Sequence, residues 1–321
     1  SIYLRTVYID GTQMDLDLSD SYNGHLLPSA VRRLLRERDS LGRDDLHGQG
    51  IFCSFDEAAG HKATALILGP PGTPYAHGFY FFEFTFPNDY PQRPPQVKFR
   101  TGDGRVRFNP NLYVNGKVCL SILGTWPGPR WTELCNFRTT LLSLQSLLCT
   151  KPLQNEPGYE DSVGVDCELY SAMIRYENVS VAVLHMLRHM PTQFVHFRKI
   201  VEVEFLSNFA DYLQALTEFD SCEGRFDRCP VYNFITRYST SMVRMSLEEL
   251  RNSLLEDDEL SAEHALIGNR LDGSSSQSPS RHVAQGLRIR HTIWRTVQQT
   301  IHRCTSCMVR CGRVLDPRAW C

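Results

Sequence analysis

The chain has 321 residues, a length that allows one or two domains. Hydrophobic residues make up 42% and charged residues 22%, so the chain can bury a sizeable core and is not disordered as a whole. Lys and Arg total 34 against 36 Asp and Glu, and this net charge of -2 provides no global basic field for nucleic acid. No apolar run reaches the roughly 18 residues of a membrane span, so we expect neither nucleic-acid nor membrane partners.

The cysteines indicate the compartment. Eleven are scattered along the chain, and its first residues carry no secretory signal, so we expect a reducing environment, cytoplasmic, nuclear or both. The glycosylation acceptor pattern Asn178-Val179-Ser180 is then a chance occurrence. One Cys-x-x-Cys pair near the end lacks a well-spaced second pair, so we expect free thiols there and no zinc site. The cysteines of that region are Cys304, Cys307, Cys311 and Cys321.

The first predicted element is an amphipathic helix over 28–41, "PSAVRRLLRERDSL". Its apolar residues recur at near-helical spacing, which predicts one buried stripe. Arginines between them give the helix a basic side, made of Arg32, Arg33, Arg36 and Arg38. Judged by pattern alone, such a side is a solvated surface.

Four strands are predicted next, at 50–55, 61–69, 79–86 and 96–100. Each is rich in β-branched or aromatic residues, and Gly or Pro clusters separate them. Because the spacers are short, we expect an antiparallel meander rather than a parallel sheet with crossover helices. The proline-dense spacer at 87–95 is predicted to be a rigid bend, in which a cis bond can form at Pro94-Pro95.

The second half of the chain is predicted to be mostly helical. Thr132 can cap a helix over 133–149 whose apolar stripe packs on the sheet; the stripe contains Leu134, Phe137, Leu141, Leu144 and Leu148. From 162 to about 256 the pattern is again helical, with weak strand signals and a polar break near 220–231. One helix alone cannot bury the stripe Phe205, Phe209, Tyr212 and Leu216, so we expect this region to pack on the core. The Ser-rich residues 272–281 are predicted to be a linker.

A single cysteine stands in the stretch "NPNLYVNGKVCLSILGTW" at 109–126. The pattern alone favours a buried structural cysteine, since free cysteine usually behaves as a small hydrophobe. A thiolate can also form thioesters, but no histidine in this stretch could serve it as a base. The neighbouring side chains are the amides of Asn109, Asn111 and Asn115. Asn111 follows a proline, and it could either donate to an oxyanion or simply shape the turn.

The order of these motifs resembles the ubiquitin-conjugating enzyme family. The elements in common are the helix, the four-strand meander, "YPQRPP", "NPN", a cysteine eight positions after Asn111, "LSIL", a tryptophan loop and a leucine-rich helix. The resemblance covers roughly residues 22–190. Within the family, "PGPRW" and "QNEPGYE" at 154–160, with the helical stretch beyond 160, fit a long-tailed type.

The resemblance implies an α+β fold, with a four-stranded antiparallel meander flanked by helices and followed by a helical C-terminal extension. It suggests a catalytic core at 22–190 and an extension at 191–260. A Ser-rich linker and a tail expected to be disordered would occupy 261–321. We further expect the helices of 162–256 to help select the modifier or the activating enzyme.

The implied function is covalent relay of a protein modifier. Cys119 would accept ubiquitin or a ubiquitin-like modifier as a thioester from an activating enzyme, then deliver it to a substrate lysine or a ligase. The ATP would be used by the activating enzyme, so no cofactor is expected here. Asn111 would hold the oxyanion during attack, and the basic helix 28–38 would be read by the activating enzyme.

The sequence also departs from the family pattern. Asn109 replaces the usual His of a His-Pro-Asn motif, where that residue mostly serves the local fold. Gln92 and the pair Thr132-Glu133 argue against ordinary RING-type ligases, which often contact a large apolar residue and Ser-Pro there. The acidic residue that helps a lysine lose its proton should lie near "QNEPG", where Asn155 and Glu156 are the candidates.

Two other functions are possible alternatives to conjugation. A noncatalytic ubiquitin-binding scaffold could use the same fold, but such variants lose the cysteine, and this chain keeps both Cys119 and Asn111. A thiol hydrolase is disfavoured because no histidine accompanies the cysteine in the site segment.

Overall fold

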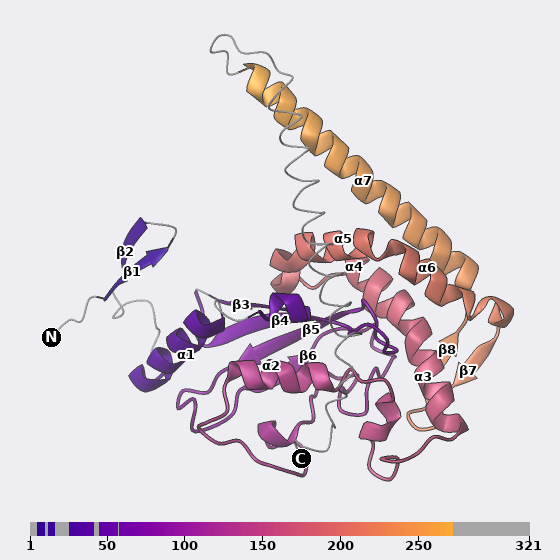
Figure 1. Ribbon diagram of the computed structural model, residues 1–321, viewed down its shortest axis with the longest axis horizontal. Helices are drawn as coiled ribbons and strands as arrows, with labels where there is room; N and C mark the ends of the chain where they lie inside the picture. The colour runs from indigo at the N-terminus through magenta and orange to yellow at the C-terminus, as the bar shows by residue number, and fades with distance from the viewer. Residues whose placement is uncertain (1–4, 10–11, 17–25, 42–44, 57, 272–321) are drawn as a thin grey trace, which may run out of the picture. The chain divides into compact units, whose positions relative to one another are not determined.

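The computed structural model describes residues 5–9, 12–16, 26–41, 45–56 and 58–271 (Figure 1). The chain divides into two compact units, Ser1–Glu256 and Asp257–Cys321. Near the N-terminus, β1 (Arg5–Ile9) and β2 (Thr12–Leu16) form an antiparallel hairpin. In the described part of the chain, no helix has both the length and the apolar character that crossing a bilayer requires. The Ser-rich linker and the four C-terminal cysteines lie outside the described residues.

The predicted meander is confirmed. It consists of β3 (Ile51–Phe55), β4 (Lys62–Leu68), β5 (Phe79–Thr85) and β6 (Gln96–Phe99), hydrogen-bonded in that order and antiparallel throughout. The spacer between β4 and β5 is a turn. The bend before β6 holds its cis bond at Tyr90-Pro91 and not at Pro94-Pro95. The Tyr90 ring is buried, with its centroid 5.0 Å from that of Phe86 and 5.9 Å from that of Trp131.

The sheet is buried on both faces. Side chains alternate along a strand, so one strand contributes to two cores. On β5, Tyr80, Phe82 and Phe84 belong to the first hydrophobic core, whereas Phe79 and Phe81 belong to the second. An open antiparallel sheet commonly leaves one face to water, and this one does not.

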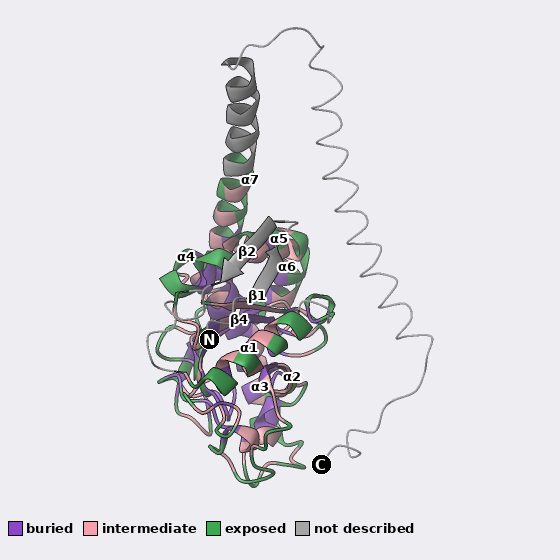
Figure 2. Cartoon of the chain, turned by 90° about the vertical axis from the view of Figure 1, so that its left-hand side faces the viewer, coloured by how far each residue is buried: buried purple, intermediate pink, exposed green. Residues whose placement is uncertain are grey.

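The first core lies between the sheet and the helices α1 (Pro28–Leu41), α2 (Phe137–Ser146) and α3 (Val165–Glu177). The bounds of α1 are those predicted. Figure 2 shows exposed positions along α1, while its residues Ala30 and Leu34 are buried.

The helix predicted over 133–149 with Thr132 as its cap begins later. The side chain of Asn136 accepts from the Thr139 N–H, and the Thr139 side chain accepts from the Asn136 N–H, which completes a capping box. Asn caps a helix more strongly than Thr, so α2 starts at Phe137. Leu134, expected on the apolar stripe, is left in the preceding loop and is 89% exposed.

The second core is closed by the residues that follow α3. These form the π-helix η4 (Asn178–His185), α4 (Met186–Arg188), the 3-10 helix η5 (Thr192–Phe197), α5 (Arg198–Ser207) and α6 (Phe209–Thr217). The ring centroids of Phe81 and Phe194 lie 4.9 Å apart, and Figure 1 places α5 on the side of the sheet opposite α2. Asn178 is buried. Its Oδ1 accepts from the Tyr80 hydroxyl and its Nδ2 donates to the Ala76 carbonyl, so the side chain is not exposed as a glycosylation acceptor.

The extension departs from the all-helical prediction in two places. The stripe from Phe205 to Leu216 spans two helices that meet at Asn208, and Phe205, Tyr212 and Leu216 are buried in the second core. The predicted polar break contains a hairpin of β7 (Phe226–Arg228) and β8 (Ile235–Arg237). Its strands are only three residues long, too short for a periodic signal. The last described helix, α7, spans Thr240–Leu271.

Candidate active site

The turn that carries the candidate residues begins with a buried amide. Asn109 is fully buried, and its Nδ2 donates to the Tyr75 hydroxyl (2.9 Å) and to the Leu147 carbonyl (2.7 Å). Its Oδ1 accepts from the backbone N–H of Asn111 (3.0 Å). Every hydrogen-bonding group of this side chain is therefore used to fix the turn, the structural role expected for the residue at this position of the motif.

Asn111 and Cys119 lie side by side across the turn. The Cys119 N–H donates to the Asn111 carbonyl (2.9 Å), and the Asn111 Nδ2 donates to the Cys119 carbonyl (2.8 Å). The Oδ1 of Asn111 is buried and has no hydrogen-bond partner among the described residues. Asn115, the third amide of the stretch, accepts from the Lys117 N–H (3.1 Å) at the exposed tip of the turn and takes no part in this pairing.

Cys119 is one of the buried residues of the core. Only 1% of the residue is exposed, and its chain neighbours Val118 and Leu120 belong to the first hydrophobic core. Because so little of it is exposed, reaction at its sulfur requires the covering chain to move aside.

The hydroxyl of Thr125 holds the backbone on both sides of Cys119 in the chain. The Oγ1 of Thr125 donates to the Val118 carbonyl (2.9 Å) and accepts from the Leu120 N–H (3.0 Å). The 3-10 helix η2 (Ser121–Leu123) lies between Leu120 and Thr125 in the chain. The backbone is thus fixed on both sides of the thiol.

Three of the other described thiols are less suited to nucleophilic chemistry. Burial raises the pKa of Cys53 to about 11, and it also raises the pKa of Cys149 and of Cys229. Since the thiolate is the nucleophile, a raised pKa lowers the reactive fraction of these three cysteines at neutral pH.

The two candidates near "QNEPG" point to different surroundings. The Asn155 Nδ2 donates to the Leu147 carbonyl (3.3 Å), the same oxygen that binds Asn109, so Asn155 adjoins the motif. The Glu156 Oε2 accepts from the Tyr232 hydroxyl (2.5 Å) and so faces the loop between β7 and β8. Asn155 ends the 3-10 helix η3 (Pro152–Asn155).

Comparison with known proteins places this site in a family. The model of the family described as ubiquitin-conjugating enzyme matches residues 33–168, from within α1 into α3. Ubiquitin-conjugating enzyme E2 Z of Homo sapiens is 36% identical over 245 residues, covering 75% of this chain and 69% of that protein. The protein of the same name from Danio rerio is 40% identical over 234 residues, covering 68% of this chain and 71% of that protein. The chain belongs to the ubiquitin-conjugating enzyme family.

This conjugating enzyme is accordingly a ubiquitin-pathway transferase, and the noncatalytic scaffold alternative is not supported. Members of the family interact with ubiquitin and with activating enzymes or ligases. Among solved structures, the E2 domain of a Toxoplasma gondii ubiquitin conjugating enzyme aligns with a TM-score of 0.36 and 27% identity, covering 47% of this chain and 97% of that chain.

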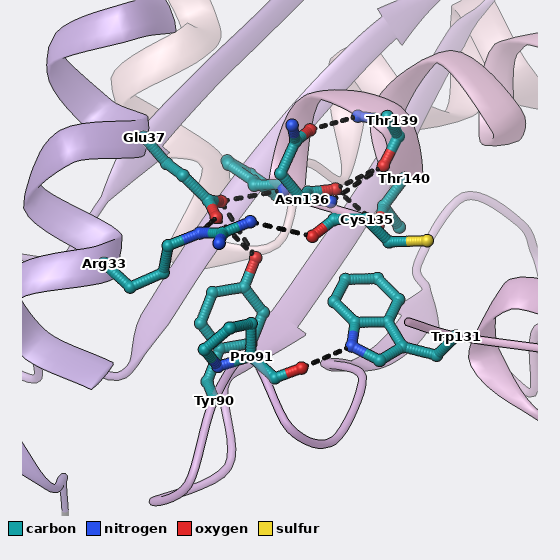
Figure 3. A network of polar contacts seen from close by, with 10 residues as sticks. Arg33, Glu37, Tyr90, Pro91, Trp131, Cys135, Asn136, Thr139 and Thr140 are labelled. Atoms are coloured by element: carbon teal, nitrogen blue, oxygen red, sulfur yellow. Dashed lines mark hydrogen bonds and ion pairs between the residues drawn. The ribbon is translucent and has the colours of Figure 1, made fainter. Parts of the chain in front are cut away.

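In the conjugating enzyme, a buried carboxylate fastens α1 to the start of α2 (Figure 3). Glu37 accepts from the Tyr90 hydroxyl (2.8 Å), from the Phe137 N–H (2.8 Å) and from Arg33. Burial raises the pKa of Tyr90, so its hydroxyl remains a donor. Arg33 also donates to the Cys135 carbonyl (2.9 Å), and its guanidinium is therefore occupied within the fold.

The exposed part of the predicted basic face is smaller than the sequence indicates. Arg32 and Arg36 are exposed, Arg38 is half-buried, and Arg33 serves the network just described. On the adjoining loops, Gln92 and the pair Thr132-Glu133 are exposed. This surface of the conjugating enzyme therefore presents mainly polar groups beside Leu134.

No pattern in the sequence indicates that Arg107 and Tyr232 contact each other beside the candidate site. The Arg107 guanidinium lies between the rings of Tyr113 (3.7 Å to the centroid) and Tyr232 (4.1 Å), and its Nη2 donates to the Pro110 carbonyl (2.6 Å). Tyr232 comes from the extension, far along the chain from the motif, so only the folded arrangement reveals the contact.

Proposed function

We propose that this enzyme carries a modifier, ubiquitin or a ubiquitin-like protein, as a thioester on Cys119 and delivers it to a substrate lysine or to a ligase. The observation that carries this proposal is the reciprocal pairing of Cys119 with Asn111, within the residues that the family model matches. Burial raises the thiol pKa of Cys53, Cys149 and Cys229, which makes these three cysteines weaker candidates.

Loading and transfer are both acyl exchanges. In loading, the Cys119 thiol loses its proton, its sulfur bonds the modifier's terminal carbonyl carbon, and the bond to the activating enzyme's sulfur breaks. In transfer, the amine of a lysine loses a proton and attacks the same carbonyl carbon. The C–S bond then breaks, and Cys119 leaves as a thiolate. The enzyme needs no cofactor of its own, because ATP is used by the activating enzyme.

Asn111 is proposed to stabilise the oxyanion of the transfer step. Its Nδ2 is bonded to the Cys119 carbonyl at rest, so donation to an oxyanion requires that bond to open or to be shared. A side-chain amide of this kind contributes about 3 kcal/mol to an acyl-transfer transition state.

The activating enzyme is proposed to contact α1 through Arg32 and Arg36, the exposed arginines of the 28–38 segment. Charge on such a surface accelerates encounter with an acidic partner more than it strengthens the final complex. Cytoplasmic or nuclear residence belongs to the same proposal, since the activating enzyme and the modifier must share the compartment.

A loading assay tests the central step. Purified protein, an activating enzyme, ATP and labelled modifier are run on gels with and without reductant, beside Cys119→Ala, Cys119→Ser and the control Cys135→Ser. We expect a reductant-sensitive band in the wild type and in Cys135→Ser. Cys119→Ala should lose the band, and Cys119→Ser should replace it with a reductant-resistant ester. Absence of any band from the folded protein, with every activating enzyme and modifier offered, would overturn the proposal.

A further inference from the structure

The hairpin of the extension inserts its loop into the catalytic core. Cys229 and Phe234, at the two ends of the loop between β7 and β8, are buried members of the first hydrophobic core. Tyr232, between them, is half-buried and packs against the same core, with its ring centroid 5.7 Å from that of Tyr170. The loop is therefore anchored at both ends, and the position of Tyr232 is fixed.

The hydroxyl of Tyr232 holds an acidic group at the end of η3. It donates to the Glu156 Oε2 (2.5 Å), and no hydrogen bond between the described residues engages the other carboxylate oxygen, Oε1. Burial, and then this hydrogen bond, raise the pKa of Tyr232, so the phenol stays protonated and donates at every physiological pH. One oxygen of Glu156 is thus restrained, while the second is left to accept a proton.

The ring of Tyr232 holds the motif itself. It covers one face of the Arg107 guanidinium at 4.1 Å, and Tyr113 covers the other at 3.7 Å. Arg107 donates to the carbonyl of Pro110, the residue immediately before Asn111. A single side chain of the extension therefore contacts both segments that border the candidate site, the motif turn and the Glu156 segment.

An open groove lies where these contacts meet. Its walls come from the motif side, with Arg107, Tyr113 and Asn115, and from the hairpin loop, with Val231, Tyr232 and Asn233. Tyr232 therefore lines this groove and also bonds the Glu156 carboxylate.

We propose that Tyr232 is a positioning residue for the acceptor lysine, acting through Glu156. Its hydroxyl orients the carboxylate so that Oε1 takes the proton released by the lysine ammonium, and its ring keeps Arg107 against the Asn111 turn. The amine that results attacks the thioester carbonyl carbon, the C–S bond breaks, and the nitrogen gives up its second proton to the departing Cys119 thiolate. The first proton remains on Glu156 until it is lost to solvent. This inference rests on the proposed function, because it concerns the transfer step from Cys119.

Single-turnover discharge tests the inference. Pre-loaded enzyme is mixed with free lysine, and loss of the thioester is followed for the wild type, Tyr232→Phe, Glu156→Gln, the double variant and the matched control Tyr113→Phe. Tyr113 provides the other ring over Arg107, and the structure gives its hydroxyl no hydrogen bond to a described residue. Loading rates are measured in parallel.

We expect all variants to load at the wild-type rate. At neutral pH, discharge should slow about tenfold in Tyr232→Phe and about a hundredfold in Glu156→Gln. The double variant should be no slower than Glu156→Gln, because the hydroxyl acts through the carboxylate. The defect of Tyr232→Phe should also shrink toward about pH 10, where free lysine loses its proton unaided.

Three results would overturn the inference while leaving thioester loading intact. These are wild-type discharge in Tyr232→Phe, a double variant whose defect is the product of the single defects, or a Tyr232→Phe defect that stays constant with pH. A constant defect would mean that the hydroxyl only supports the fold. Failure of the wild type to load, by contrast, contradicts the proposed function and not the role of Tyr232.

Discussion

Asn111 shows how one side chain can serve the fold and the chemistry together. At rest its Nδ2 supports the Cys119 carbonyl, while its buried Oδ1 has no partner among the described residues. A buried polar atom left unpaired is costly and uncommon in a native fold.

Replacing Asn111 by Ala should therefore separate the two roles. We expect loading to stay within about twofold of the wild type and transfer to lysine to slow about a hundredfold, because the lost donor acts only at the oxyanion. Single-turnover loading and discharge, measured on the same preparation, check this. Equal losses in both steps, together with a lowered melting temperature, would assign Asn111 to the turn alone.

At the scale of single residues, the sequence predicts contacts between residues that are close together in the chain. Asn111 and Cys119 are eight residues apart, and the family resemblance that joins them in one site agrees with their observed pairing. The contact of Tyr232 with Glu156 joins segments far apart in the chain, and the environment of Glu37 is assembled from three separate segments. No spacing rule predicts such contacts, because they depend on how whole elements pack.

Among the elements, those with a strong periodic pattern were predicted best. The bounds of α1 match the prediction, and the four strands fall within the predicted ranges because aromatic alternation marks both faces of the sheet. The start of α2 was wrong because two polar residues compete to cap it, and the structure selects Asn136 through its partner Thr139. The hairpin at 226–237 was missed because its strands are short and their outer face is exposed, with Phe226 64% exposed.

Mutations at the start of α2 can distinguish the two candidate capping residues, Asn136 and Thr132. Asn136→Ala should lower the free energy of unfolding by about 1 kcal/mol, since it removes an acceptor from the first turn of the helix. Thr132→Ala, at the exposed residue first expected to be the cap, should change it by less than about 0.5 kcal/mol. Urea unfolding of both variants checks this, and a larger effect at Thr132 would contradict the observed start of α2.

For the molecule as a whole, the extension is part of the core rather than an appendage. Phe194, Phe205 and Tyr212 close the second core over a sheet face that would otherwise expose Phe79 and Phe81. The expectation that 162–256 packs on the core is therefore confirmed, while its share in selecting a modifier stays a prediction. The division into 22–190, 191–260 and 261–321 likewise stays a prediction of the sequence.

Acidification should loosen this packing. Burial lowers the pKa of three histidines where the extension meets the rest of the fold. His77 contacts Asp211, which partly opposes the shift, His196 bonds Thr64 (3.1 Å), and His185 lies in η4. As the pH falls, these histidines take up protons at a higher pH in the unfolded chain than in the folded protein. Their contribution to the free energy of unfolding is therefore fully present above about pH 6.5 and is lost as the pH falls toward the lower folded-state pKa values.

Melting temperatures between about pH 7.5 and 5.5 should therefore decrease, and His77→Asn should flatten the slope. Asn is the matched replacement because His77 has a left-handed φ of 59°, which Asn tolerates. Burial raises the carboxyl pKa of Glu177 and Glu204, and their protonation in the fold opposes the trend, so the comparison with His77→Asn isolates the histidine contribution. A melting temperature that is constant or rises on acidification would contradict the prediction.

The doubly buried sheet also constrains protein engineering. A chimera that joins this extension to the core of another conjugating enzyme would pack the apolar helices of the extension on the outer face of the host's sheet. To receive them, the host sheet would need matched apolar residues at the positions of Phe52, Leu66, Leu68, Phe79 and Phe81. The extension and the outward face of the sheet are therefore exchangeable only as a unit, and a tail swap without those five positions should give an insoluble protein.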